Sequence, residues 1–208
     1  MNRRDFVVRG AAAAAAIGMA QCAVALASKS APAGAVRGAL PYKVIFDARF
    51  DACRAFAAGA ARLGCPVQRI AGDVTALWFN ELQPHWARGE GSIVGMTTGT
   101  SLFCLEQLAW GQWMRVRARI EHWSGPDGTL RHRLLLPDSI LPEATAALAG
   151  DARWPERLAG PLVNGLSVSR YRGSAERVVC TRSVSRDDPR PSLVSWIIAT
   201  PATRVRAV

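Results

Sequence analysis

The sequence predicts a mixed α/β domain, in which three N-terminal βαβ-type units on a small parallel sheet are continued by an antiparallel C-terminal hairpin and further strands. Two observations predict this fold class. Between residues 42 and 113, short apolar runs of strand length alternate with segments whose apolar residues recur at helical spacing. After Met114, apolar and polar residues alternate one by one on both sides of a turn.

Strands and helices alternate in the first half of the chain. The strands are expected at residues 42–46, 67–71 and 92–96, and the helices at residues 50–63, 76–82 and 102–113. Gly64 and Pro66 end the first helix, because neither residue continues a helix well. Asp73 or Thr75 can cap the second helix. This order indicates right-handed βαβ units, which place the three strands parallel in one sheet.

The second half of the chain is expected to be antiparallel. Residues 115–123 and 129–136 predict a hairpin about the turn Ser124–Gly128. A loop rich in Pro and Ala follows at residues 137–161, with a short helix at residues 142–148. Three further strands are expected at residues 166–171, 177–184 and 193–200. Half of the chain is hydrophobic and it has no internal repeat, so residues 41–208 are expected to form a single domain with one mixed sheet.

The first residues of the chain have the composition of an export signal. The pair Arg3-Arg4 and the nearby Phe6 precede a weakly apolar stretch that is rich in Ala and Gly. This arrangement resembles a twin-arginine signal peptide, which directs proteins that are already folded to the bacterial Tat translocation machinery. Asn2 and Val7 depart from the residues that are usual at these positions. The resemblance covers the leader alone, and it implies the Tat translocation machinery as a partner.

The leader ends in Ala25-Leu26-Ala27, and these small residues suit cleavage after Ala27. The signal is therefore expected to span residues 1–27, followed by a flexible linker at residues 28–40. The mature protein is expected in the periplasm or outside the cell. The alternative is an uncleaved leader that anchors the protein in the inner membrane, although its apolar stretch of about 18 residues is short for a spanning helix.

The formal net charge of +10 favours anionic partners, such as an acidic small molecule, an acidic protein or a membrane surface. Nucleic acid is not expected as a partner, because the protein is expected to be exported and no basic cluster alternates with aromatic residues as in single-strand binders. Arginine enrichment throughout a GC-rich genome is the alternative, and it gives the charge no function.

No cofactor follows from the sequence. The haem-attachment motif, the cysteine spacing of iron–sulfur proteins and the glycine fingerprint of dinucleotide binding are absent from it. No Cys and His spacing suits zinc, so no residue is assigned as a metal ligand.

The loop after the third expected strand is the first candidate site for a ligand. It consists of Thr97, Thr98, Gly99, Thr100 and Ser101. Ligands bind beyond the carboxyl ends of parallel strands, so this loop is expected to lie near Arg49, which follows the first strand. Backbone N–H groups and the positive end of a helix dipole suit a phosphate, sulfate or carboxylate there. The alternative is that Thr100 or Ser101 only caps the helix.

Asp47 and Asp73 are candidates for catalysis, because they follow neighbouring strands. Together they could bind a divalent cation or share acid–base work. In the alternative interpretation, Asp73 caps a helix and Asp47 holds a turn or pairs with Arg49.

The hairpin offers a second candidate pair. Folding it about its turn places Glu121 opposite His132, as an acid–histidine couple or as a solvated ion pair. His122 is expected on the other face of the hairpin. Without a placed nucleophile these residues do not make a catalytic triad. Cys104 is expected to be a buried and inert thiol on the apolar face of its helix.

The sequence therefore predicts an exported protein without catalytic activity, which binds an anionic small molecule or assists a periplasmic enzyme. The competing hypothesis is a small periplasmic hydrolase or transferase that uses Asp47 and Asp73. A third possibility is an obligate subunit of a larger complex, which an exposed apolar surface would favour.

Overall fold

The computed structural model describes residues 40–89, 91–125, 127–150, 152–167, 175–182 and 192–200. Contacts within the chain group Val36–Val208 as one unit, separate from Met1–Ala35. All helices and strands below belong to the larger unit. Several sequence expectations lie outside the described residues: the export signal with Arg3, Arg4 and Phe6, its cleavage positions Ala25 and Ala27, and the linker as far as residue 39.

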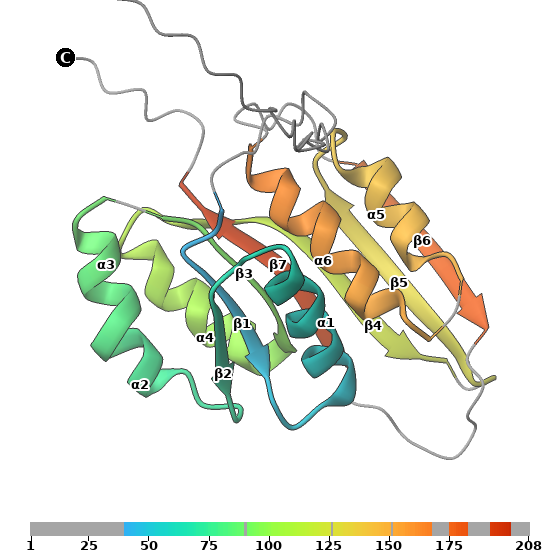
Figure 1. The fold of residues 1–208 in the computed structure, drawn as a ribbon, viewed down its shortest axis with the longest axis horizontal. Coiled ribbons are helices and arrows are strands. Elements are labelled where there is room, and N and C mark those ends of the chain that lie inside the picture. The colour runs from blue at the N-terminus through green and yellow to red at the C-terminus, as the bar shows by residue number, and fades with distance from the viewer. Residues whose placement is uncertain are drawn as a thin grey trace, which may run out of the picture. The chain divides into compact units, whose positions relative to one another are not determined.

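The described residues form a seven-stranded sheet in the order β2-β1-β3-β7-β4-β5-β6 (Figure 1). The strands are β1 (Lys43–Asp47), β2 (Val67–Ile70), β3 (Ile93–Thr98), β4 (Arg115–Ser124), β5 (Thr129–Leu136), β6 (Ala175–Arg182) and β7 (Leu193–Ala199). β1 pairs in parallel with β2 and β3, and every other neighbouring pair is antiparallel. The predicted fold class, a mixed α/β domain, is thus confirmed.

Helices cover both faces of the sheet. They are α1 (Asp51–Arg62), α2 (Thr75–Leu77), the π-helical η1 (Trp78–Leu82), α3 (Gln83–Ala87), α4 (Gly99–Trp110), α5 (Leu141–Leu148), α6 (Trp154–Asn164) and the short 3-10 helix η2 (Gly165–Ser167). Figure 1 shows α1, α6 and α5 side by side over the near face, with α4 behind the sheet. The chain moves from β1 out to β2 and then back past β1 to β3. Right-handed connections in these opposite directions place their helices on opposite faces.

Each face of the sheet packs against its helices through its own apolar core. On the side of α1, α5 and α6, Phe56 and Leu158 are fully buried in a cluster that includes Val94 of β3. On the other side, Leu102 of α4 packs in a cluster with Trp196 of β7. All residues of β7 are buried, because this strand is covered on both faces.

The hairpin of β4 and β5 differs by one residue from the predicted pairing. The Gly125 N–H donates to the Thr129 carbonyl at 2.7 Å, and Gly128 adopts a φ of 74°. This geometry makes a three-residue loop with its glycine in the left-handed conformation, which is a common hairpin connection. His122 therefore lies opposite His132, and Glu121 lies opposite Arg133. The predicted pairing of Glu121 with His132 is wrong.

Helix α6 lies in the segment that was predicted to be a loop. Pro155 stands in its first turn, where a missing N–H is tolerated, while Gly160 and Pro161 made the segment look unlike a helix. Its buried residues, such as Leu158 and Leu162, face α1 and the sheet. The strand predicted at residues 166–171 is also wrong in its described part, because Leu166 belongs to η2.

Helix α4 turns a different side toward the sheet than the sequence suggested. It buries Leu102, Leu105 and Ala109, whereas Phe103 and Cys104 are exposed. The expectation of a buried Cys104 is therefore wrong. Three buried residues at positions i, i+3 and i+7 occupy one side of a helix, and Phe103 and Cys104 lie beyond that side.

Candidate functional site

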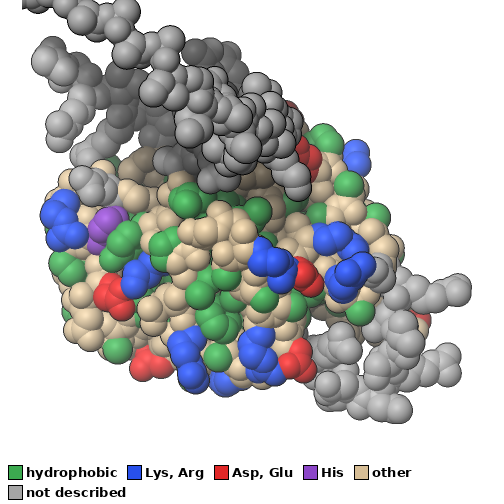
Figure 2. All heavy atoms as spheres, viewed as in Figure 1, with side chains coloured by type: hydrophobic (Ala, Val, Ile, Leu, Met, Phe, Trp, Pro, Cys, Tyr) green, Lys and Arg blue, Asp and Glu red, His purple; other side chains and the backbone are tan. Residues whose placement is uncertain are grey.

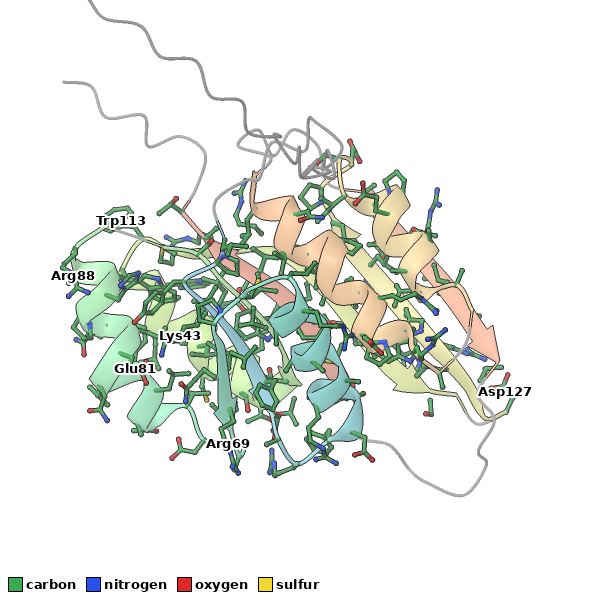
Figure 3. All side chains as sticks on the ribbon, viewed as in Figure 1. Lys43, Arg69, Glu81, Arg88, Trp113 and Asp127 are labelled. Atoms are coloured by element: carbon green, nitrogen blue, oxygen red, sulfur yellow. The ribbon has the colours of Figure 1, made fainter. Side chains whose placement is uncertain are left out.

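Three loops meet at the edge of the sheet where the parallel strands end. β1 lies between β2 and β3, so that the chain leaves β1 toward one neighbour and later returns to the other. In open α/β sheets, ligands bind at such a reversal of strand order. Figure 2 shows basic and acidic side chains interspersed along this edge, at the lower side of the view, and Figure 3 places Arg69 of β2 there.

Asp47, the last residue of β1, is fully buried and bonded to Arg49. The Arg49 Nε donates to Asp47 Oδ1 at 2.9 Å, and the Arg49 Nη2 donates to Oδ2 at 2.6 Å. This hydrogen bonding raises the pKa of Arg49 above its ordinary value, and it supplies the buried carboxylate with the counter-charge that it needs. The alternative interpretation given above therefore describes Asp47: it forms a structural ion pair with Arg49.

The Arg49 side chain joins the first loop to the second. A Cβ atom at Gly72 would lie 2.5 Å from Arg49 Nη2, and Gly72 has a φ of +92°. Only glycine fits here without strain, because the backbone is left-handed and the guanidinium is close. The Gly72 carbonyl in turn accepts a hydrogen bond from the Ser101 hydroxyl at 2.8 Å. The structure therefore brings Arg49 and Ser101 to the same edge, as the sequence predicted.

The hydroxyls of Thr97, Thr98 and Ser101 in the third loop form hydrogen bonds within the protein. Thr98 caps α4, since its Oγ1 accepts from the Ser101 N–H at 3.3 Å. The Thr97 Oγ1 is buried and accepts from the Trp196 Nε1 at 3.1 Å. Thr100 is exposed at the surface, next to Gly99. The loop thus acts as a helix cap, which is the alternative that the sequence left open, although the capping residue is Thr98.

Asp73 acts as a cap as well. Its Oδ1 accepts a hydrogen bond from the Thr75 N–H at 2.8 Å, and hydrogen bonds from Thr75 lower the pKa of Asp73. With Asp47 bonded to Arg49, the two carboxylates have separate structural roles. Across the described residues, no three side chains of His, Cys, Asp or Glu come together as a metal site.

A buried polar chain that the sequence did not predict crosses three strands of the sheet. The His122 Nδ1 and the His132 Nδ1 lie 2.7 Å apart, and the His122 Nε2 lies 2.8 Å from the Ser195 Oγ. All three side chains are buried, and the indole of Trp154 packs on both imidazoles at centroid distances of 4.5 and 4.7 Å. The sequence did not predict this contact because the predicted hairpin register was wrong by one residue. Such a shift places His132 on the face opposite to His122.

Burial determines the protonation of this chain. It lowers the pKa of His132 to about 4 and that of His122 well below its ordinary value, where the neighbouring His132 adds to the effect. Both rings are therefore neutral at neutral pH. A neutral imidazole carries one N–H, so the hydrogen bonds run in one direction, from Ser195 to His132 or the reverse. Ser195 is fully buried, and a nucleophile without access to substrate does not support catalysis.

The four described cysteines carry free thiols. Burial raises the pKa of Cys53, beside Asp47, to about 12. A thiol in that state is not a nucleophile at neutral pH. Cys104 and Cys180 are exposed.

An open hollow of about 350 Å³ lies between α1 and α6. Its lining residues are Gly59, Arg62, Leu63, Arg153, Glu156, Arg157 and Gly160. The charged residues of this lining are three arginines and one glutamate, and Arg62 is paired with Glu156. Arg153 lies at the N-terminus of α6, where the helix dipole adds positive potential. The sequence did not predict this site, because its pattern predicted a loop where α6 lies.

Comparison with protein-family models, with curated proteins and with solved structures finds no match to this chain. Within the described residues, no helix combines the length and the apolar character that are needed to cross a bilayer.

Proposed function

We propose that this chain is an exported protein without catalytic activity, which binds a small anionic molecule in the hollow between α1 and α6. Export rests on the leader, whose Arg3-Arg4 pair resembles a signal for the Tat machinery. The mature protein would then begin at Ser28 and work in the periplasm or outside the cell.

The arginine content of the hollow carries the binding proposal. Arg62, Arg153 and Arg157 approach it from two helices, and its volume of about 350 Å³ suits a small molecule. Arg157 is held in place through its Nε, which donates to the Ala147 carbonyl at 3.2 Å. Guanidinium groups bind carboxylates and phosphates with two parallel hydrogen bonds, so an organic acid or a phosphate ester fits this lining.

The state of the other candidate groups supports a role in binding rather than catalysis. Asp47 is bonded to Arg49, Asp73 caps a helix, and His132 shares a buried hydrogen bond with His122. A general acid or base must reach the reacting group of a substrate. The hydrolase or transferase hypothesis therefore loses its assigned residues.

The test is a thermal-shift screen of the protein that begins at Ser28, with phosphate, sulfate, nucleotides and organic acids. A selective ligand at 100 times its Kd adds about 2.7 kcal/mol to the free energy of unfolding and raises Tm. Calorimetry then compares variants with the native protein. Arg153→Gln should weaken binding about tenfold or more, because it removes one charge-assisted hydrogen bond.

Two further variants assign the site. Arg133→Gln is the matched control, since Arg133 pairs with Glu176 on the distant strand β6 and should leave binding unchanged. Arg49→Gln tests the loop at Thr97–Ser101. Loss of binding in Arg49→Gln but not in Arg153→Gln would move the site to that loop, and a screen without any shift would contradict the proposed function.

A further inference from the structure

The indole of Trp154, the first residue of α6, packs on the buried pair of His122 and His132. Its ring centroid lies 4.5 Å from the His122 ring and 4.7 Å from the His132 ring. Trp154 itself is 7% exposed and belongs to the apolar core on this side of the sheet. The beginning of α6 is thus held on the sheet by a contact with two rings that can take up protons.

The same turn of α6 forms part of the wall of the hollow. Arg153 precedes Trp154, Glu156 and Arg157 follow it, and all three line the hollow together with residues of α1. A helical turn moves as a unit, because backbone hydrogen bonds join its residues. One of these bonds runs from the Arg157 N–H to the Arg153 carbonyl at 3.2 Å. A movement of Trp154 away from the imidazoles would therefore displace this part of the wall.

Apart from the two imidazoles themselves, the described groups that face them are neutral. Those placed by the strand register, by a hydrogen bond or by ring contacts are Leu193 and Ser195 of β7, Val179 of β6 and Trp154 of α6. Of the charged residues in α5, in α6 and at its N-cap, Glu143 is exposed, and Arg153, Glu156 and Arg157 line the hollow. Burial therefore opposes a charge on either ring. It is the main cause that lowers the pKa of both, and His132 adds to it for His122.

We infer that the pair of His122 and His132 is an acid-sensitive switch that controls the first turn of α6. While both rings are neutral, Trp154 packs on them and the wall of the hollow is closed. When a ring takes up a proton, the state in which Trp154 has moved away is favoured, because water then solvates the charged imidazole. Release of an anion from the hollow in acid would follow, and this consequence alone rests on the proposed function.

Hydrogen exchange tests the switch in the protein that begins at Ser28, which retains the unit Val36–Val208. The reporters are the amides of Arg157, Leu158 and Ala159 in α6, with exchange rates corrected for the intrinsic effect of pH. His132 has a pKa of about 4 when buried and about 6.5 when solvated, so its share alone should speed this exchange about 20-fold from pH 7 to pH 5. An unchanged corrected rate would overturn the inference.

Low concentrations of urea show whether α6 opens by itself. A local opening exposes little surface, so the exchange of its amides depends weakly on urea, whereas exchange through unfolding of the whole domain depends on it strongly. We expect weak dependence at pH 5 for α6 and strong dependence for Leu105 and Ala109 of α4, which belong to the core on the opposite face. Equal urea dependence of the two helices would overturn the inference.

A substitution assigns the effect to the pair. In His132→Asn, the side-chain amide can still hydrogen-bond to the His122 Nδ1 but takes up no proton in this pH range. The acid effect on α6 exchange should therefore shrink about 20-fold. His85→Gln is the matched control, since His85 stacks on Tyr42 and is partly exposed, and it should leave the effect unchanged. An undiminished acid effect in His132→Asn would overturn the inference, and the urea experiment decides it even where this variant does not fold.

Sulfate separates the switch from the proposed function, because its charge does not change between pH 7 and pH 5. Sulfate bound in the hollow favours the closed state, so it should slow the exchange of α6 at pH 5. Absence of this slowing would count against the proposed function. The acid and urea dependence of exchange without sulfate would still decide the switch.

Discussion

The Nδ1 atoms of His122 and His132 lie 2.7 Å apart beneath Trp154, in a part of the core that excludes water. At this distance one Nδ1 donates a hydrogen bond and the other accepts it, so the accepting ring must be neutral. The donating ring is either neutral as well or carries a positive charge that no water solvates. Burial makes the charged form costly. The pair is therefore stable when neutral, and its stability depends on pH.

We predict that the protein loses stability as the pH falls below about 6.5, the pKa of an unfolded histidine. The folded pKa of His132 is lowered to about 4 and that of His122 is also lowered, so between these values the unfolded state binds more protons than the folded state. Stability must then fall with falling pH, by about 2 kcal/mol at pH 5 for His132 alone. Urea denaturation between pH 8 and pH 5 measures this slope.

The control for the pH dependence is His85→Gln, because His85 stacks on Tyr42 and is partly exposed. The slope should survive in this variant. A free energy of unfolding that stays constant between pH 8 and pH 5 would contradict the prediction that His122 and His132 are buried as a neutral pair.

Ser195→Ala should lower the free energy of unfolding by about 1–3 kcal/mol. The substitution leaves the buried His122 Nε2 without the hydroxyl that lies 2.8 Å away. The matched control is Ser192→Ala, which removes an exposed serine hydroxyl and should change stability by less than about 0.5 kcal/mol. Thermal and urea denaturation measure the stability of both variants. An equal effect of the two substitutions would show that Ser195 does not stabilise the buried hydrogen bonds of His122 and His132.

Gly59→Ala should destabilise the contact between α1 and α6. A Cβ atom at Gly59 would lie 2.2 Å from the Glu156 carbonyl oxygen, a backbone atom that cannot move without shifting α6. We expect a loss of about 1–3 kcal/mol, as for other overpacked sites. Gly160→Ala is the opposite case, since nothing lies within 4 Å of the added atom, and it should stabilise the helix by about 0.5–1 kcal/mol. Equal Tm values for the two variants would contradict this close packing.

Gly72→Ala should cost more than Gly89→Ala, although both glycines have a positive φ, of +92° and +82°. At Gly89 the added Cβ meets nothing within 4 Å, so the variant loses only the backbone preference, about 1–2 kcal/mol. At Gly72 it displaces the Arg49 guanidinium and leaves the buried Asp47 without its full counter-charge. We expect a further loss of about 1–2 kcal/mol. Equal losses in denaturation would show that Arg49 can move without cost.

The candidate sites differ in how far they follow from the sequence. Loop order along the chain was sufficient to predict that Arg49 and Ser101 meet at one edge, because parallel strands end on the same side. The sequence could not decide whether the hydroxyls there remain free, since this depends on the Trp196 indole, 99 positions away from Thr97. The sequence could not predict the hollow for a similar reason, because its lining combines α1 with residues 153–160.

Local patterns in the sequence determined the fold class, most helices and strands, and the parallel direction of β1, β2 and β3, since periodicity and βαβ handedness act over short stretches of chain. Tertiary structure alone decided the rest. Helix α6 forms despite Pro161 because its apolar side is buried against α1, and packing there outweighs local propensity. A single glycine turn decided the register that joins His122 to His132. The sheet then brought Ser195 beside them, because strand order places β7 next to β4, and no periodicity encodes that order.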